Sequence, residues 1–446
     1  MLSEGLITSI RAQPKSSNTA IAKDVGIYLH ELHPTHTIKS SFKKSSTPVN
    51  SLVASSTHIF AAQADKAVVH VYSRERGNQE ALISFPERIH SLALVGDGIL
   101  VLGTAEGRII LWEVCTGRQV STPAAHLQTV SCLAATQLHL VTGSEDSNIH
   151  VWSIPRLLSL SSSETQQPLR SLSNHRAAIT SLAIGHSSSS TNICVSASKD
   201  NTIIVWNYHT GDLLRTFLLP STPLCLALDP CDRAVYAGFE DGSLQLIEFS
   251  QPHSTINPLY DTTLQTTPVQ ITIPPWTSPS EPGAALCIGL SYDGTYLFSG
   301  HATGKIAQWD TGRRAFSSEL SDLNAPITNL LMSSPFPPKR LTRASTVVKP
   351  KLGEGQYVFT AQLSKSTASN SKFGRAVENQ GLPADLLEDA IARFSQPAST
   401  SSHTASSSGD EKLRQENAEL WKVVNEQRAL QKKTFEKYTK LKSGGS

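Results

Sequence analysis

The chain has 446 residues, and its 39 lysines and arginines nearly balance 37 aspartates and glutamates, so the formal net charge is +2. This balance argues against a dedicated binder of the phosphate backbone, which would carry a strong basic excess. Six cysteines without a CxxC pair indicate neither a disulfide framework nor a zinc site. The N-terminus lacks the pattern of a signal peptide, and no apolar run is long enough to span a bilayer. We therefore expect a soluble, intracellular chain without a membrane segment.

A short pattern recurs along most of the chain, in which an acidic or polar turn residue precedes an aromatic residue by six positions. Asp146 precedes Trp152 in this way, and Asp200 precedes Trp206. The same six-residue spacing leads to Trp112 and Trp309, and looser copies of the pattern lead to positions 30, 72 and 247. Seven positions therefore correspond to the Trp of a repeat: 30, 72, 112, 152, 206, 247 and 309. Four of the six intervals are 40–42 residues, which is close to the period of WD repeats.

The segments between these positions alternate apolar and polar residues and are rich in β-branched side chains, with Gly, Asn or Asp at the turns. In chain order the pattern predicts strands over residues 129–134, 139–144, 148–152, 179–183 and 224–228. Residues 159–169, 187–192 and 250–283 have loop compositions. A strand pair at 326–332 and 355–363 either completes the arrangement or lies outside it.

Short strands at a regular spacing favour radially stacked four-stranded sheets, because one such sheet cannot bury both faces alone. Over roughly residues 1–320 the chain resembles the WD40 β-propellers, and the resemblance implies an all-β, seven-bladed ring. We expect the propeller with its closing strands to occupy residues 1–363. Residues 364–409 then form a flexible, Ser-rich linker with a short helix at 382–395.

Residues 410–443 predict one long helix that contains neither Gly nor Pro. Leu413 and Leu420 occupy heptad position d, and Asn417 and Val424 occupy position a. Together with Leu441 further along the helix, these residues form one stripe. An Asn at position a favours a parallel, two-stranded coiled coil. The stripe is thus compatible with a homodimer or with a helix docked on another surface.

Two repeats carry a His, a Ser and an Asp, the residue types of a hydrolase triad, beside a Trp: His126, Ser144, Asp146 and Trp152, and His175, Ser198, Asp200 and Trp206. An enzyme needs one such site and not several copies. The resemblance to WD repeats implies a structural network instead, in which these groups form a buried hydrogen-bond chain. The sequence allows either of two hydroxyls in each chain: Thr142 or Ser144 in the first, and Ser196 or Ser198 in the second.

Two further features have an unremarkable interpretation. Cys132, Cys225 and Cys287 occupy one innermost-strand position in three repeats and are expected to be small buried residues and not metal ligands. A basic run contains Lys339, Arg340, Arg343, Lys349 and Lys351. It predicts a solvated loop, with contact to RNA or to an acidic partner as the alternative.

The first repeats lack Trp, the middle repeats carry it, and the segment HATGKIAQWD and a helical tail follow. This layout is similar to that of the fungal WD-repeat subunits of the Rix pre-60S maturation complex. The resemblance implies a non-enzymatic nuclear scaffold, without cofactor or metal, for processing the internal transcribed spacer. Implied partners are a helical-repeat scaffold subunit, a smaller third subunit and the AAA ATPase midasin on the pre-60S particle. A propeller enzyme, a ubiquitin-ligase adaptor and a direct RNA binder are the alternatives.

Overall fold

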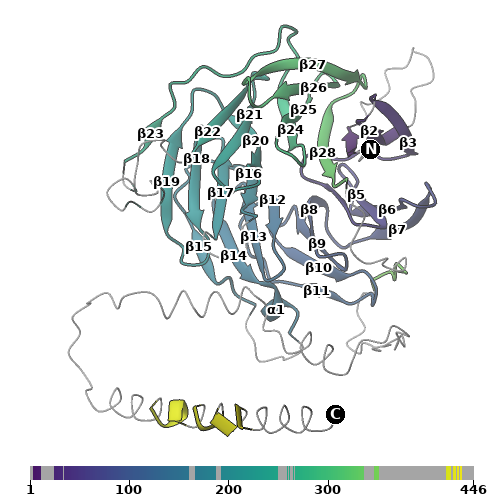
Figure 1. Ribbon diagram of the computed structural model, residues 1–446. Coiled ribbons are helices and arrows are strands. Elements are labelled where there is room, and N and C mark those ends of the chain that lie inside the picture. The colour runs from purple at the N-terminus through teal and green to yellow at the C-terminus, as the bar shows by residue number, and fades with distance from the viewer. Residues whose placement is uncertain are drawn as a thin grey trace, which may run out of the picture. The chain divides into compact units, whose positions relative to one another are not determined.

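A computed structural model describes residues 4–11, 25–33, 35–159, 166–186, 192–249, 259, 261, 265, 267–335 and 346–350 of the N-terminal unit, and 418–422, 425–427, 429–430 and 432–433 of the C-terminal unit. In the N-terminal unit seven β-sheets surround a common centre, and their innermost strands face it (Figure 1). We number these sheets blades 1 to 7 along the chain, and each is antiparallel from its inner to its outer strand except where stated below.

The first four blades each have four strands. Blade 1 contains, from the inside outward, β28 (Ile327–Ser333), β1 (Gly5–Ile10), β2 (Val25–Glu31) and β3 (Thr37–Lys43). Blade 2 contains β4 (Leu52–Ala54), β5 (His58–Ala62), β6 (Val68–Ser73) and β7 (Gln79–Ser84). Blade 3 contains β8 (Ile89–Val95), β9 (Ile99–Thr104), β10 (Ile109–Glu113) and β11 (Gln119–Ser121). Blade 4 contains β12 (Val130–Ala135), β13 (His139–Ser144), β14 (Ile149–Ser153) and β15 (Arg170–Leu172), with the short helix α1 (Ile154–Leu157) after β14.

The last three blades differ in their outer strands. Blade 5 contains β16 (Ile179–Ile184), β17 (Ile193–Ser198), β18 (Thr202–Asn207), β19 (Leu213–Leu218) and β23 (Val269–Gln270). Blade 6 contains β20 (Pro223–Leu228), β21 (Ala234–Phe239) and β22 (Leu244–Glu248). Blade 7 contains β24 (Ala285–Leu290), β25 (Tyr296–His301), β26 (Lys305–Asp310) and β27 (Ala315–Asp322). The predicted inner strands therefore lie within one or two residues of the observed ones.

The ring closes through blade 1, which combines strands from both ends of the propeller. β28 pairs antiparallel with β1, with Gly5 opposite Ser333 and Ile10 opposite Ile327. The segment 326–332 thus completes the ring, and its proposed partner strand at 355–363 lies outside the described residues. Closure removes a free edge between the first and last repeats, which would otherwise expose unpaired backbone groups.

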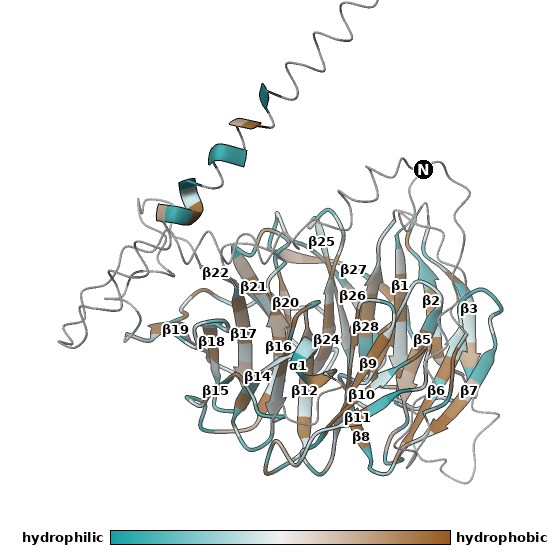
Figure 2. Cartoon of the chain, turned by 90° about the horizontal axis from the view of Figure 1, so that it is seen from below, coloured by the Kyte–Doolittle hydropathy of each residue, from teal (hydrophilic) through white to brown (hydrophobic). Residues whose placement is uncertain are grey.

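Seven hydrophobic cores hold the ring together, and each lies between two adjacent blades. One example joins Phe60 of blade 2 to Trp112 of blade 3, whose rings meet edge to face. In Figure 2 hydrophobic residues follow the strands, whereas hydrophilic residues concentrate in the turns. Each blade is buried on both faces only because a neighbour covers each of them, so the fold depends on the complete ring.

The insertion between β22 and β24 is partly built into the propeller. Its strand β23 adds a parallel fifth strand to blade 5, and Trp276 bridges Leu244 at the outer edge of blade 6 through two backbone hydrogen bonds of 2.6 and 3.0 Å. Trp276 is 6% exposed. It therefore covers the edge of β22, where blade 6 lacks a fourth strand among the described residues. Residues 267–283, expected as loop, therefore cover two strand edges.

Residues 389–446 form the second compact unit of the chain. Its described residues, which begin at 418, are helical. Leu420, Trp421 and Leu430 are each about 60% exposed on this helix. Leu413, Asn417, Val424 and Leu441 of the predicted stripe lie outside the described residues, as do residues 382–395, where a short helix is predicted.

Candidate functional site

In blade 4 the singled-out His and Trp meet at one hydroxyl, and the Asp lies beside the His. The Nε2 of His126 lies 2.8 Å from the hydroxyl of Thr142, and the indole of Trp152 donates to the same hydroxyl at 3.2 Å. The Nδ1 of His126 lies 3.4 Å from the carboxylate of Asp146. Burial, together with the nearby His150, lowers the pKa of His126 to about 4, so the imidazole is neutral at physiological pH.

Blade 5 repeats this chain with shorter distances. The hydroxyl of Ser196 lies 2.7 Å from His175 Nε2 and accepts from the indole of Trp206 at 2.8 Å. The Nδ1 of His175 lies 3.2 Å from the Asp200 carboxylate. Burial by itself would raise the pKa of Asp200, but hydrogen bonds from His175, Thr202 and the backbone N–H of Arg176 outweigh it and lower that pKa well below its usual value. The carboxylate is therefore held charged.

Ser144 and Ser198 are not the bridging hydroxyls, and their assignment to the His–Trp network is corrected here. Trp152 pairs across the sheet with Leu140, two residues from Thr142 and four from Ser144. At about 3.3 Å per residue Ser144 lies about 13 Å along the strand, beyond the reach of the indole. Ser144 donates to the carbonyl of Gln128, and Ser198 donates in the same way to that of Ala177. Both serines hold turns.

A third chain, in blade 7, is one that the sequence pattern did not single out. Trp309 donates to the hydroxyl of Ser299 at 2.7 Å, and that hydroxyl lies 2.7 Å from His301 Nε2. His301 is on the same strand as Ser299, whereas His126 and His175 precede theirs in loops, and its Nδ1 meets the carbonyl of Gly283 at 3.0 Å. In all three blades the hydroxyl precedes the Trp by ten residues. A search of the sequence for this interval would have identified the chain in blade 7.

Blade 1 carries a variant without Trp. His30, at the position that Trp occupies elsewhere, lies 2.8 Å from the hydroxyl of Thr8, and its Nδ1 lies 2.9 Å from Nε2 of His36. Burial, with the nearby His36, lowers the pKa of His30 to about 4. This blade is thus built around a neutral histidine pair, and not around an indole.

These chains are suited to joining strands and not to chemistry on a substrate. Thr142, Ser196 and Ser299 are each 0% exposed, so no substrate atom can reach their hydroxyls. In addition, each hydroxyl is shared between a histidine and an indole donor, whereas a nucleophile needs a free line of approach. Among the residues the structure describes, no group of three His, Cys, Asp or Glu side chains could hold a metal ion.

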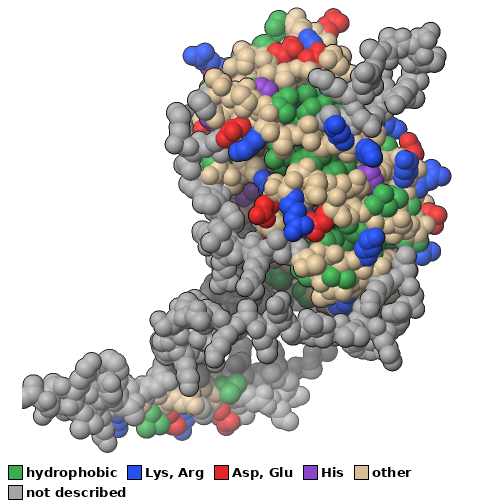
Figure 3. Space-filling model, turned by 90° about the vertical axis from the view of Figure 1, so that its right-hand side faces the viewer, with side chains coloured by type: hydrophobic (Ala, Val, Ile, Leu, Met, Phe, Trp, Pro, Cys, Tyr) green, Lys and Arg blue, Asp and Glu red, His purple; other side chains and the backbone are tan. Residues whose placement is uncertain are grey.

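The cysteines and the basic run separate in the structure. Cys132, Cys225 and Cys287 are buried on the innermost strands of three different blades. Burial raises the pKa of the Cys132 and Cys225 thiols to about 12, so they are protonated. Of the basic run only Lys349 is described, and it is exposed; Lys339, Arg340, Arg343 and Lys351 lie outside the described residues. On the face drawn in Figure 3 basic and acidic side chains are interspersed.

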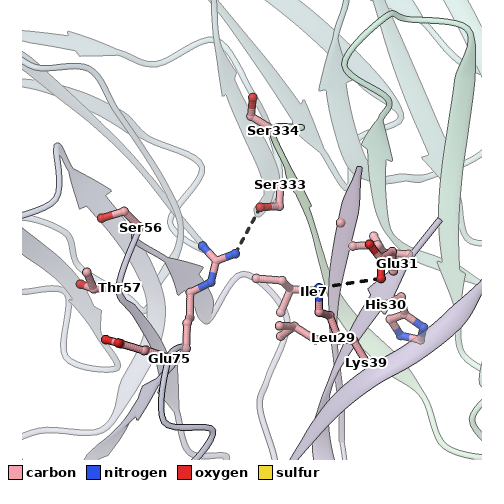
Figure 4. A pocket seen from close by; sticks show the side chains of 13 residues that line it. Ile7, Leu29, His30, Glu31, Lys39, Ser56, Thr57, Glu75, Ser333 and Ser334 are labelled. Carbon is pink, nitrogen blue, oxygen red and sulfur yellow. Dashed lines mark hydrogen bonds and ion pairs between the residues drawn. The ribbon is translucent and has the colours of Figure 1, made fainter. Parts of the chain in front are cut away.

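A hollow of about 430 Å³ lies between blades 1 and 2, at the ends of β2 and β28 (Figure 4). Arg74 projects into it from blade 2 and donates to the hydroxyl of Ser333 at 3.3 Å and to the carbonyl of Ser55 at 2.8 Å. Burial lowers the pKa of Arg74. Lys39 on the opposite wall is 3.8 Å from Glu31. The hollow thus joins two blades at the ring closure, and both cations bind groups of its own walls.

Comparison with known proteins locates the most regular repeats. The model of the WD domain, G-beta repeat, matches residues 117–153 and 166–207. These two stretches run from β11 to β14 and from β15 to β18, so they hold the strands of the two chains that end at Trp152 and Trp206. No described helix is both long and apolar enough to cross a membrane.

Whole proteins with names that refer to pre-rRNA processing are also similar to this chain. Pre-rRNA-processing protein crb3/ipi3 of Schizosaccharomyces pombe is 27% identical over 328 residues, which are 68% of this chain and 73% of that protein. Pre-rRNA-processing protein IPI3 of Yarrowia lipolytica is 25% identical, over 83% of this chain and 88% of that protein. WD repeat-containing protein 18 of Danio rerio is 25% identical, over 74% and 78%.

Proposed function

This chain is a WD40 β-propeller, and on that premise we propose that it is a non-catalytic scaffold subunit of a nuclear complex that matures the pre-60S particle. The observation that carries the proposal is the similarity to pre-rRNA-processing proteins, which in Yarrowia lipolytica extends over 83% of this chain. A match of that extent reaches well beyond residues 117–153 and 166–207, which the generic repeat model matches.

The construction of the ring supports a scaffold. Seven inter-blade cores and the pairing of β1 with β28 make the propeller a closed body. We propose that the His–hydroxyl–Trp chains serve this rigidity by joining strands within blades 4, 5 and 7. A rigid ring holds its binding surface in place, so little entropy is lost when that surface is ordered on binding a partner. This property suits a scaffold subunit.

The proposed partners are a helical-repeat scaffold subunit, a third subunit of the same Rix-type complex, and the AAA ATPase midasin on the pre-60S particle. The proposed role is support for processing of the internal transcribed spacer. Near-neutral net charge and interspersed surface charges favour protein partners over direct binding of RNA.

We further propose that the C-terminal helix joins two copies of the chain. Leu420 and Leu430 are 62% and 63% exposed in the single chain. An isolated helix of this kind is marginal in water unless its apolar stripe is covered. A parallel pair would cover Leu413, Leu420, Val424 and Leu441 and would place Asn417 against its own copy.

Affinity purification of the tagged full-length chain from its own cells, followed by mass spectrometry, tests the proposed function. We expect the helical-repeat subunit, a third small subunit, midasin and large-subunit precursors to co-purify. Depletion of the chain should in parallel raise the amount of rRNA precursors that still contain the internal transcribed spacer, while small-subunit precursors stay constant as the internal control.

Other outcomes would replace the proposal. Recovery of ubiquitin-ligase subunits without ribosomal precursors would favour an adaptor. Binding of naked RNA by the pure protein, with an affinity that falls steeply with salt, would favour a direct RNA binder. Unchanged precursor levels after depletion would contradict a role in this pathway.

A further inference from the structure

One Trp of the ring obtains its hydrogen bond from a segment that follows the propeller. In blades 4, 5 and 7 the indole N–H donates to a hydroxyl ten residues earlier in the chain: Thr142, Ser196 and Ser299. The same position in blade 3 is Leu102, opposite Ile110 in the sheet, and it offers no acceptor. Trp112 is nevertheless 0% exposed, so its N–H needs a partner from elsewhere.

That partner is the main chain at residues 346–350, which we name the strap. The indole of Trp112 donates to the carbonyl of Val348 at 3.1 Å, and the N–H of Val348 donates to the carbonyl of Val114 at 2.9 Å. One residue of the strap is therefore held through both of its backbone groups, by a side chain and by the backbone that follows β10. β9 and β11 pair with β10 on its two sides, so the strap is held at the end of this strand and does not extend the sheet.

The site also has a specific shape. Gly117, which has a φ of +75°, lies against the strap so closely that a Cβ atom there would stand 2.8 Å from the carbonyl oxygen of Lys349 and 2.9 Å from a methyl group of Val348. A residue with a side chain would therefore push the strap away. Val347 packs against the core that blades 2 and 3 share, whereas Thr346 and Lys349 are exposed.

We propose that the end of β10 and the turn after it, around Trp112, Val114 and Gly117, form a peptide-binding site in blade 3, and that its ligand is this chain's own strap. The site selects an extended segment with an apolar side chain at the position of Val347 and two free backbone groups at the next residue. The chain is thus bound to the ring in blade 1 through β28 and again at blade 3 through the strap.

Hydrogen exchange on the full-length protein, read by mass spectrometry, tests the site. In the wild type we expect the amide of Val348 to exchange at least about tenfold more slowly than in an unstructured peptide of the same sequence. Val347→Asp places a charge against the core and should remove this protection. Thr346→Asp makes the same change of charge at the neighbouring exposed position and should keep it.

A second measurement does not depend on how well a variant folds in the strap region. A fluorescent peptide of residues 343–353 should bind the full-length Val347→Asp protein, whose site is vacated, and should bind the wild type at least about tenfold more weakly because the strap competes in cis. Exchange of the wild-type Val348 amide at the rate of a free peptide would overturn the proposal. Equal binding of the peptide to the wild type and to Val347→Asp would overturn it as well.

Discussion

The hydroxyl of Ser131, near the start of β12, donates to the carbonyl of Ile179, the first residue of β16 in the next blade, at 2.6 Å. The same contact recurs around the ring: Ser91 to Val130, Thr180 to Pro223, Cys225 to Ala285, and Cys287 to Ile327. Each accepting carbonyl belongs to the first residue of an innermost strand, where a bulge shifts the register. A bulge leaves one carbonyl without a partner in its own sheet, and the neighbouring blade supplies the donor.

This belt of contacts should contribute measurably to stability. Thr180→Val keeps the shape of the side chain but removes its donor to Pro223, and we expect the free energy of unfolding to fall by about 1 kcal/mol. Thr180→Ser retains the hydroxyl and is the matched control, with a smaller loss. Urea denaturation of the two variants measures the difference, and equal stabilities would remove the belt as a stabilising device.

The carboxylate of Asp200 should contribute more to the free energy of unfolding than the carboxylate of an ordinary turn aspartate. Asp200→Ala leaves His175, Thr202 and the N–H of Arg176 without their acceptor, so we expect a loss of roughly 1–3 kcal/mol. Asp241→Ala is the control, since among the described residues Asp241 accepts only from the N–H and hydroxyl of Ser243 in its own turn. Chemical denaturation compares the two. A loss as small for Asp200 as for Asp241 would contradict the structural role of the network.

Stability should rise with pH between about 4 and 6.5. His30 and His126 have pKa values of about 4 in the folded protein, below the value of about 6.5 for an unfolded chain. The unfolded state therefore binds more protons in this window, and the stabilisation present above pH 6.5 is lost as the pH falls toward 4. Glu4, whose pKa is raised by burial, acts in the opposite direction near the lower end.

The histidine contribution can be isolated with one variant. His126→Gln removes a titrating group while keeping an amide that can hydrogen-bond, so the rise in unfolding free energy between pH 4.5 and 7 should be smaller than in the wild type. The difference is about 3 kcal/mol at most for one group with this pKa. Parallel pH profiles of wild type and variant would count against a buried neutral His126.

Truncation should separate the strap from the rest of the tail. A chain ending at residue 364 keeps the ring and the strap and should melt cooperatively as a β protein, at the same temperature as the full chain. A chain ending at residue 335 lacks the acceptor for Trp112 and should melt at a lower temperature. Circular dichroism and calorimetry measure both. A molten product ending at 364 would place part of the propeller core in the tail.

Light scattering should detect the proposed dimer. The full-length chain at micromolar concentration should have twice the monomer mass, and a chain ending at residue 409 should be monomeric. Leu420→Lys places a charge on the apolar stripe and should yield monomers. Ala418→Lys adds the same charge at an exposed position beside the stripe and should not. A monomeric wild type would leave the helix as a docking element for another subunit.

Much of the ring is determined by local sequence patterns. A strand buried on both faces needs a run of apolar residues of strand length, and a tight turn needs residues that tolerate positive φ, such as Asn201 and Gly107. Such features depend only on neighbours in the chain. The repeat interval, the strand positions and the Trp positions could therefore be predicted from residues 1–320. The expectation that His126 and His175 belong to a buried chain comes from the resemblance to WD repeats and not from these patterns.

The tertiary structure decided the features that depend on partners far apart in the chain. The spacing of residues 142 and 144 allows either hydroxyl, and only the pairing of Trp152 with Leu140 selects Thr142. The acceptor for Trp112 lies 236 residues later. A pattern within one repeat carries no signal for such a contact, because ring closure and the path of the chain after β28 bring the two residues together. Local periodicity thus specifies the blades, whereas the assembled ring determines which polar groups they exchange.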